Sequence, residues 1–152
     1  MPQRPALFRT VPEQDFLGFW PENVLRADKV ARFLDLDRSD VARIAGVSVK
    51  SVRYDHKIPK EVLERLSEIA VVCGLVAQFF EGSVHKTTLW FQTPNSLLGG
   101  MSPRDMIRLG RYDQLRRFVV NALQESGMEP ATHGQIDATI SKRDEAAQSS
   151  AA

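Results

Sequence analysis

The chain has 152 residues, 43% of them hydrophobic and 26% charged, which fits one compact domain or two small ones that share a core. No apolar run approaches the roughly 18 residues that indicate a membrane span, and the first residues lack the apolar core of a signal peptide. We therefore expect a soluble, cytoplasmic protein. The formal net charge of +1 by itself argues neither for nor against nucleic-acid binding.

The charges are unevenly distributed along the chain. Residues 41–60 contain five basic side chains and one acidic one, namely Arg43, Lys50, Arg53, Lys57 and Lys60 against Asp55. Residues 104–117 contain five arginines and two aspartates, the arginines being Arg104, Arg108, Arg111, Arg116 and Arg117. Two basic patches separated by an apolar segment predict two binding surfaces for two different partners.

Residues 1–22 combine four prolines with Phe8, Phe16, Phe19 and Trp20. This mixture breaks regular structure but is too aromatic for a disordered tail, so we predict an arm that packs on its own domain or on a sister subunit. A separate ligand-binding role for the arm is the alternative.

Residues 23–58 have the pattern of a DNA-binding helix-turn-helix. After a short helix from Ala27, Asp37 is placed to cap a second helix, with Asp40 at its third position. Gly46 allows a sharp turn, and Ser48 is placed to cap a recognition helix with Val52 facing inward. The first turns of such a helix enter the major groove. The predicted DNA contacts are Arg43, Ser48, Val49, Lys50, Ser51, Arg53, Tyr54 and Lys57. The alternative is a packed three-helix unit with solvated lysines.

Residues 59–87 predict a long helix and a linker, with the helix running from Pro59 to about Gly82. Between Ile69 and Phe80 nearly every residue is apolar, so this helix should be buried on all sides. We expect it to form the core of a homodimer; a monomer in which the N-terminal arm covers it is the alternative. Cys73 lies within this run and is predicted to be a buried, structural cysteine.

Residues 88–127 begin with an unusual series of turn signals. Leu89 to Phe91 lead into a Pro94-Asn95 turn, Gly99-Gly100 frees the backbone, and Ser102-Pro103 starts a helix with Asp105 at its third position. Gly110 is predicted to end this helix after about two turns. A further amphipathic helix follows, with Leu115, Phe118, Val119, Ala122 and Leu123 on its inner face and Gly127 as its stop.

The ordered set of Trp90, Pro94-Asn95, Leu98-Gly99-Gly100, Ser102-Pro103 and Gly110-Arg111 resembles the toxin-binding domain of MbcA/ParS/Xre-type antitoxins, which are partners of RES-domain toxins. With the helix-turn-helix included, the resemblance runs from roughly Val24 to Gly127. It implies an all-α protein in which a helix-turn-helix bundle is joined by a long helix to a small toxin-binding domain. The toxin contacts that we assign on this basis are Trp90, Asn95, Leu98, Gly99, Arg104, Arg108 and Arg111.

The resemblance also implies a function. The protein would neutralise a RES-domain toxin that consumes NAD or transfers from it, and would repress its own operon by binding operator DNA as a homodimer within a larger toxin–antitoxin complex. The alternative is a stand-alone transcriptional regulator whose C-terminal domain binds a small ligand or a protein.

Catalytic constellations are not evident in the sequence. The three histidines fall in three different segments, and Ser102 is explained by helix capping. We therefore expect neither enzymatic activity nor a cofactor. Residues 128–152 have no aromatic residue and few apolar ones, which predicts a tail that is disordered alone. The alternative is a tail that folds on a partner through Ile136 and Ile140.

Overall fold

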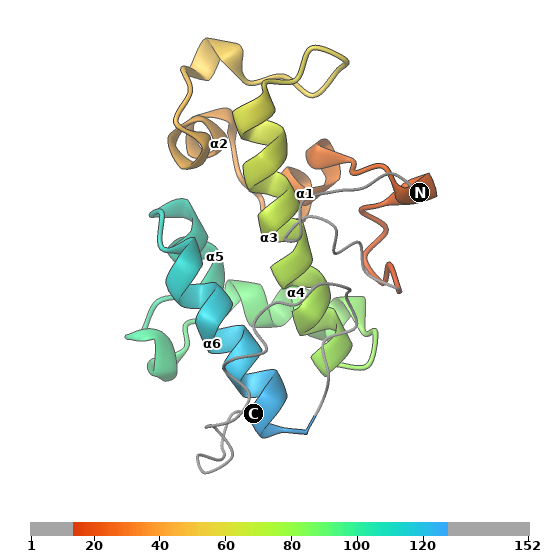
Figure 1. Cartoon of the computed structure of the whole chain (residues 1–152). Coiled ribbons are helices and arrows are strands. Elements are labelled where there is room, and N and C mark those ends of the chain that lie inside the picture. The colour runs from red at the N-terminus through yellow and green to blue at the C-terminus, as the bar shows by residue number, and fades with distance from the viewer. Residues whose placement is uncertain (1–13, 128–152) are drawn as a thin grey trace.

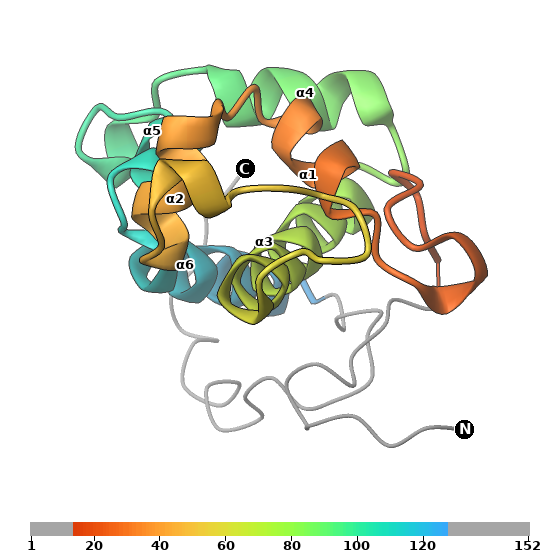
Figure 2. The same ribbon diagram turned by 90° about the horizontal axis from the view of Figure 1, so that it is seen from above.

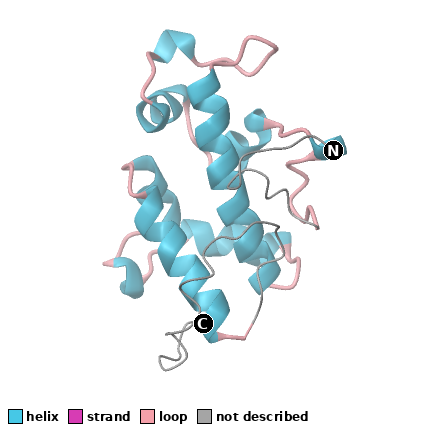
Figure 3. Ribbon diagram, viewed as in Figure 1, coloured by secondary structure: helices cyan, strands magenta, loops and turns pink. Residues whose placement is uncertain are grey.

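A computed structural model of the chain describes residues 14–127, and all regular elements of this part are helical (Figures 1 and 3). The elements, including three short 3-10 helices (η), are η1 Pro21–Asn23, α1 Ala27–Phe33, α2 Arg38–Ala45, η2 Val49–Ser51, α3 Lys60–Phe79, α4 Val84–Gln92, η3 Ser96–Leu98, α5 Pro103–Arg108 and α6 Tyr112–Glu125. The predicted all-α class is thus confirmed for these residues. The predictions for residues 1–13 and for the tail from 128 onward lie outside the described part of the chain.

Helix α3 is the central element of the fold. It packs against α1, α2, α4 and α6, and half of its residues are buried, Val62, Leu66 and Ile69 completely. Figure 2 shows α3 and α6 side by side, with α4 crossing on the opposite side of the molecule. The predicted burial of the long helix is confirmed. Because one chain buries the helix, its apolar sequence no longer indicates a homodimer core.

The described part of the N-terminal arm packs on its own domain, as predicted. Phe19 and Trp20 are buried in the core, and the Asp15 carboxylate fixes their backbone by accepting hydrogen bonds from both amides, at 3.0 and 2.9 Å. The Phe19 ring meets Phe33 edge-on, with 5.7 Å between the ring centroids. The arm thereby closes the core over α1.

One continuous hydrophobic cluster extends from Phe19 to Leu123. The predicted DNA-binding and toxin-binding segments therefore share a core. Helix α4 was missed in the sequence analysis, and it crosses the predicted boundary between residues 87 and 88. The sequence does contain a signal for the start of α4, namely the helix-capping residue Ser83. Its hydroxyl accepts a hydrogen bond from the Lys86 amide at 3.1 Å.

Several predicted helix boundaries are confirmed. Asp37 and Asp40 form a reciprocal capping box at the start of α2, and the Ser102 hydroxyl accepts a hydrogen bond from the Asp105 amide at 3.1 Å at the start of α5. Gly110 has a φ of 82°, a left-handed conformation that glycine adopts without a side-chain clash, and it follows the end of α5. Ser102 and Gly110 thereby fix the two ends of α5 and the point at which α6 follows.

Candidate functional site

The recognition helix predicted after Ser48 is not formed. The chain makes only one 3-10 turn there, η2, and Val52 is already extended with φ −74° and ψ 117°. The next residues are held in a turn by Asp55, whose carboxylate accepts two hydrogen bonds from Arg53, at 2.8 and 2.6 Å, and one from the Lys57 amide at 3.0 Å. An aspartate that bonds nearby backbone in this way competes with helix formation. The helix prediction was therefore wrong for these residues.

The predicted DNA contacts are consequently spread over a turn and an extended segment. Ser48, Val49, Lys50, Arg53 and Lys57 are exposed, and Ser51 is half-buried. The Arg53–Asp55 pair lowers the pKa of Asp55 to about 2, mainly through the hydrogen bonds that Arg53 donates. Arg53 is thus already paired with a carboxylate.

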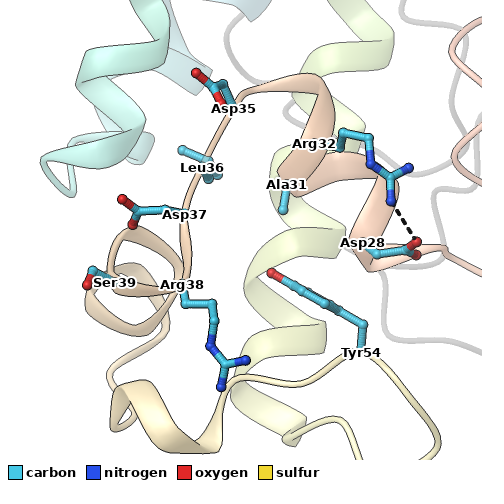
Figure 4. A pocket seen from close by; sticks show the side chains of 9 residues that line it. All are labelled: Asp28, Ala31, Arg32, Asp35, Leu36, Asp37, Arg38, Ser39 and Tyr54. Carbon is cyan, nitrogen blue, oxygen red and sulfur yellow. Dashed lines mark ion pairs between the residues drawn. The ribbon is translucent and has the colours of Figure 1, made fainter.

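Tyr54 is 37% exposed, and its ring faces α1. Figure 4 shows its ring in an open cavity of about 680 Å³ whose lining includes Asp28, Ala31 and Arg38. Burial raises the pKa of the Tyr54 hydroxyl. Three aspartates and two arginines line this cavity.

The two predicted binding patches meet at a buried carboxylate. The Asp40 side chain is only 5% exposed, and its Oδ1 accepts hydrogen bonds from Arg43 of α2 and from Arg108 of α5, each at 3.3 Å. Arg43 also donates to the Arg108 carbonyl at 3.2 Å. Burial alone would raise the pKa of Asp40, but the Asp37 amide and the two guanidinium groups outweigh burial, and the pKa lies below its usual value. The patches are therefore in direct contact.

Arg104 and Arg108, which the sequence analysis assigned to a partner, both have acceptors within the chain, although the Arg108 side chain remains 37% exposed. Arg104 turns back toward the end of α1 and donates to the carbonyls of Leu34 and Asp35, at 2.5 and 2.6 Å. Arg108 is shared between Asp40 and Asp105. Both arginines thus fasten α5 to the α1–α2 segment, a role that requires residues almost 70 positions apart to be neighbours.

Among the assigned toxin contacts, Arg111 keeps an exposed side chain. Its guanidinium lies 3.7 Å from the sulfur of Met101, at the corner between α5 and α6. Two exposed leucines were missed, Leu97 at 60% and Leu109 at 57%. The sequence contained one indication that Leu97 is exposed. Leu97 and Leu98 are adjacent in a short turn, where neighbouring side chains point to different sides, so only one of the two can face the core.

Residues 95–101 form a closed loop. The Asn95 amide donates to the Met101 carbonyl at 3.1 Å, the Gly100 amide donates back to the Asn95 carbonyl at 3.0 Å, and the Asn95 side chain accepts from Leu97 at 2.9 Å. Gly99 has a φ of 74°, which allows the chain to reverse after η3. Leu98 turns toward the core and Leu97 toward solvent. Asn95, Leu98 and Gly99 are therefore loop scaffold first.

An apolar groove lies next to this loop, between the end of α3, α4 and α6. It encloses about 90 Å³, and its lining includes Phe79, Trp90, Asn95, Leu97 and Phe118. The rings of Trp90 and Phe118 stack with an interplanar angle of 15° and 6.5 Å between their centroids. Trp90 is half-buried and so belongs both to the core and to the groove wall.

Two further kinds of reactive site are a metal centre and the single cysteine. Within residues 14–127, no group of three His, Cys, Asp or Glu side chains is arranged to hold a metal ion. Cys73 is completely buried, as predicted, and burial raises the pKa of its thiol. No helix in this part of the chain has the length and apolar character needed to cross a membrane.

Comparisons of the chain with protein-family models, curated proteins and solved structures found no match. The functional argument therefore depends on the residues and on their geometry.

Proposed function

We propose that this protein is an antitoxin that binds and neutralises a RES-domain toxin and also binds operator DNA. The observation that carries the toxin-binding part is the closed loop of residues 95–101, which presents Leu97 at the edge of the groove lined by Trp90 and Phe118. An exposed leucine beside an accessible aromatic groove is the kind of apolar centre on which protein interfaces are built.

The toxin contacts are revised accordingly. Trp90, Leu97 and Arg111 form what we call the corner surface, around the loop and its end at Met101, and the exposed Leu109 lies two residues before Arg111. Arg104 fastens α5 behind this surface. Arg108 bonds Asp40 and Asp105 but keeps a side chain that is 37% exposed, so an acidic group of the toxin can reach it. Inhibition requires only that this surface covers the toxin's access to NAD by shape-complementary burial, with Arg111 available for an acidic group of the toxin. The chain itself needs no catalytic residue for this function.

The toxin-binding part is tested by co-expression with a RES-domain toxin encoded next to this gene. The wild-type chain should restore growth and co-purify with the toxin, whereas Leu97→Asp should do neither, because it places a charge in the centre of the interface. Val24→Asp is the matched control, since Val24 is 63% exposed and belongs to the segment before α1. If wild-type protein neither rescues growth nor co-purifies, the toxin-binding proposal is wrong.

Operator binding is proposed for the α2–η2 region. Lys50 and Lys57 are exposed around η2, and Arg43 lies on α2, which corresponds to the helix that crosses the DNA backbone in a helix-turn-helix. Because the predicted recognition helix is replaced by a turn, we expect phosphate contacts to contribute most of the affinity.

A gel-shift series with the DNA directly upstream of the gene tests this part. Lys50→Ala with Lys57→Ala should weaken binding and reduce the slope of log affinity against log salt by about two. Lys86→Ala, which removes an exposed lysine from α4, is the control and should leave the slope unchanged. Equal slopes for all variants would exclude the α2–η2 region as the DNA contact.

The groove also supports a second candidate, a regulator that binds a small apolar ligand. A volume of about 90 Å³ accommodates a single aromatic ring, and Asn95 provides a polar group at its edge. Under this hypothesis phenol should raise the melting temperature of the wild-type protein, and Ala122→Phe should abolish that increase by filling the groove.

A further inference from the structure

Asp40 holds two arginines that belong to the two proposed binding regions. Its Oδ2 accepts from the Asp37 amide at 3.0 Å, and its own amide donates to the Asp37 side chain at 2.8 Å, so both backbone and carboxylate are fixed in the capping box. Both arginines bond the other oxygen, Oδ1. Arg43 and Arg108 reach this one atom from different helices at the same distance, 3.3 Å.

Both of these hydrogen bonds are long for a charged pair. Hydrogen bonds between a guanidinium and a carboxylate typically have donor–acceptor distances of about 2.7–2.9 Å. Two donors that share one buried oxygen restrict each other's approach, because their positive groups repel each other and crowd the same atom. If one arginine leaves, the other can move closer and form a stronger bond.

Each arginine also has an exposed part that an external anion could reach. The Arg43 side chain is 53% exposed and the Arg108 side chain 37% exposed, whereas the Asp40 side chain between them is only 5% exposed. A DNA phosphate that attracts Arg43 would leave Asp40 to Arg108, and an acidic group that attracts Arg108 would leave Asp40 to Arg43.

We propose that Asp40 is a positioning residue that couples the two binding regions through competition between Arg43 and Arg108 for its Oδ1. The coupling is negative: an anion bound by one arginine tightens the hold of Asp40 on the other and makes that arginine less available. This inference relies on the proposed function for the identity of the two anions, an operator phosphate and a carboxylate of the toxin. The shared acceptor itself can be tested on the protein alone.

The first experiment measures the arginine Nε–Hε resonances of ¹⁵N-labelled full-length protein by NMR. In Arg43→Gln, the Hε resonance of Arg108 should move downfield, because its bond to Asp40 shortens. The Hε of Arg26, which bonds Asp28 at 3.0 Å in a separate pair, is the control and should stay in place. An unmoved Arg108 resonance in a folded variant would overturn the proposal.

The second experiment is a double-mutant cycle on DNA affinity. Dissociation constants for a 20-base-pair duplex from directly upstream of the gene are measured for wild type, R108Q, D40N and D40N/R108Q. R108Q should weaken binding about threefold more in the wild-type background than in the D40N background. In the wild-type background the loss of Arg108 lets Asp40 hold Arg43 more tightly and away from the DNA, whereas in D40N the carboxylate that would hold Arg43 is absent. The cycle removes the general effect of losing one positive charge.

The outcomes separate this inference from the proposed function. Equal effects of R108Q in both backgrounds would reject the coupling while leaving operator binding intact. If wild-type protein does not retain the duplex, the operator-binding proposal fails, and the NMR measurement still decides whether the two arginines compete for Asp40.

Discussion

Arg104→Ala should destabilise the whole fold, although Arg104 belongs to the basic patch that the sequence assigns to partner recognition. Its guanidinium joins α5 to the C-terminal end of α1 through the carbonyls of Leu34 and Asp35, and it lies 3.7 Å from the Asp35 carboxylate. The side chain is 22% exposed. Removing it leaves the carbonyl of a buried residue, Leu34, without this donor.

The expected loss of stability follows from these two hydrogen bonds. A hydrogen bond to a charged group contributes about 1.5–3 kcal/mol, and the exposed Asp35 carbonyl recovers part of its loss by binding water. We therefore expect Arg104→Ala to lower the free energy of unfolding by about 2 kcal/mol. Arg104→Lys keeps the charge but cannot serve both carbonyls with a planar fork, so it should lose about half as much.

Urea unfolding followed by circular dichroism measures this effect. With a urea m-value of about 2 kcal/mol/M, the midpoint for Arg104→Ala should fall by about 1 M. Arg117→Ala, which truncates an exposed arginine of α6, is the control and should change the free energy by less than about 0.5 kcal/mol. Equal midpoints for the two variants would show that Arg104 does not fasten α5, and the reasoning would be refuted.

Three further predictions concern single side chains. Ser102→Ala should cost about 1 kcal/mol in urea unfolding because it removes the cap of α5; an unchanged midpoint would contradict this. Cys73 should react with a disulfide reagent only when the protein unfolds, since its side chain is completely buried; labelling within minutes under native conditions would disprove the predicted packing. Asp40 has a folded-state pKa below its usual value, so it stabilises the fold above about pH 4, and this contribution is lost as the pH falls through the folded-state pKa. Acid titrations of stability for wild type and D40N should therefore diverge, with D40N showing the smaller loss; parallel curves would exclude the effect.

Local sequence signals were sufficient where a helix begins or ends within one turn of the signal. The Asp37 and Asp40 pair, the Ser102-Pro103 start of α5 and the glycine at 110 all have the structural roles that their positions predict. The same type of reasoning failed after Ser48. There the sequence contains a cap and apolar spacing, but the Asp55 carboxylate binds Arg53 and the Lys57 backbone and holds the chain in a turn.

The sequence alone did not distinguish the arginines that bond within the chain from the one that stays exposed, and the reason lies in contacts between distant residues. Arg104, Arg108 and Arg111 are equivalent on a charge count, yet the first two bond the α1–α2 segment and the third remains exposed. Their distinction requires α5 to lie against α2, a contact between residues more than 60 positions apart in the chain. The exposure of Leu97 beside the Trp90 groove depends in the same way on how α3, α4 and α6 converge.

The sequence by itself determined the helical class, the burial of the long α3 and the turns around residues 95–110, because these depend on spacing and on backbone preferences within a few residues. Tertiary structure alone decided which charges remain free for a partner. An arginine is held by the acceptors that reach it in space, and for Arg104 these are the carbonyls of Leu34 and Asp35, 70 and 69 residues earlier in the chain.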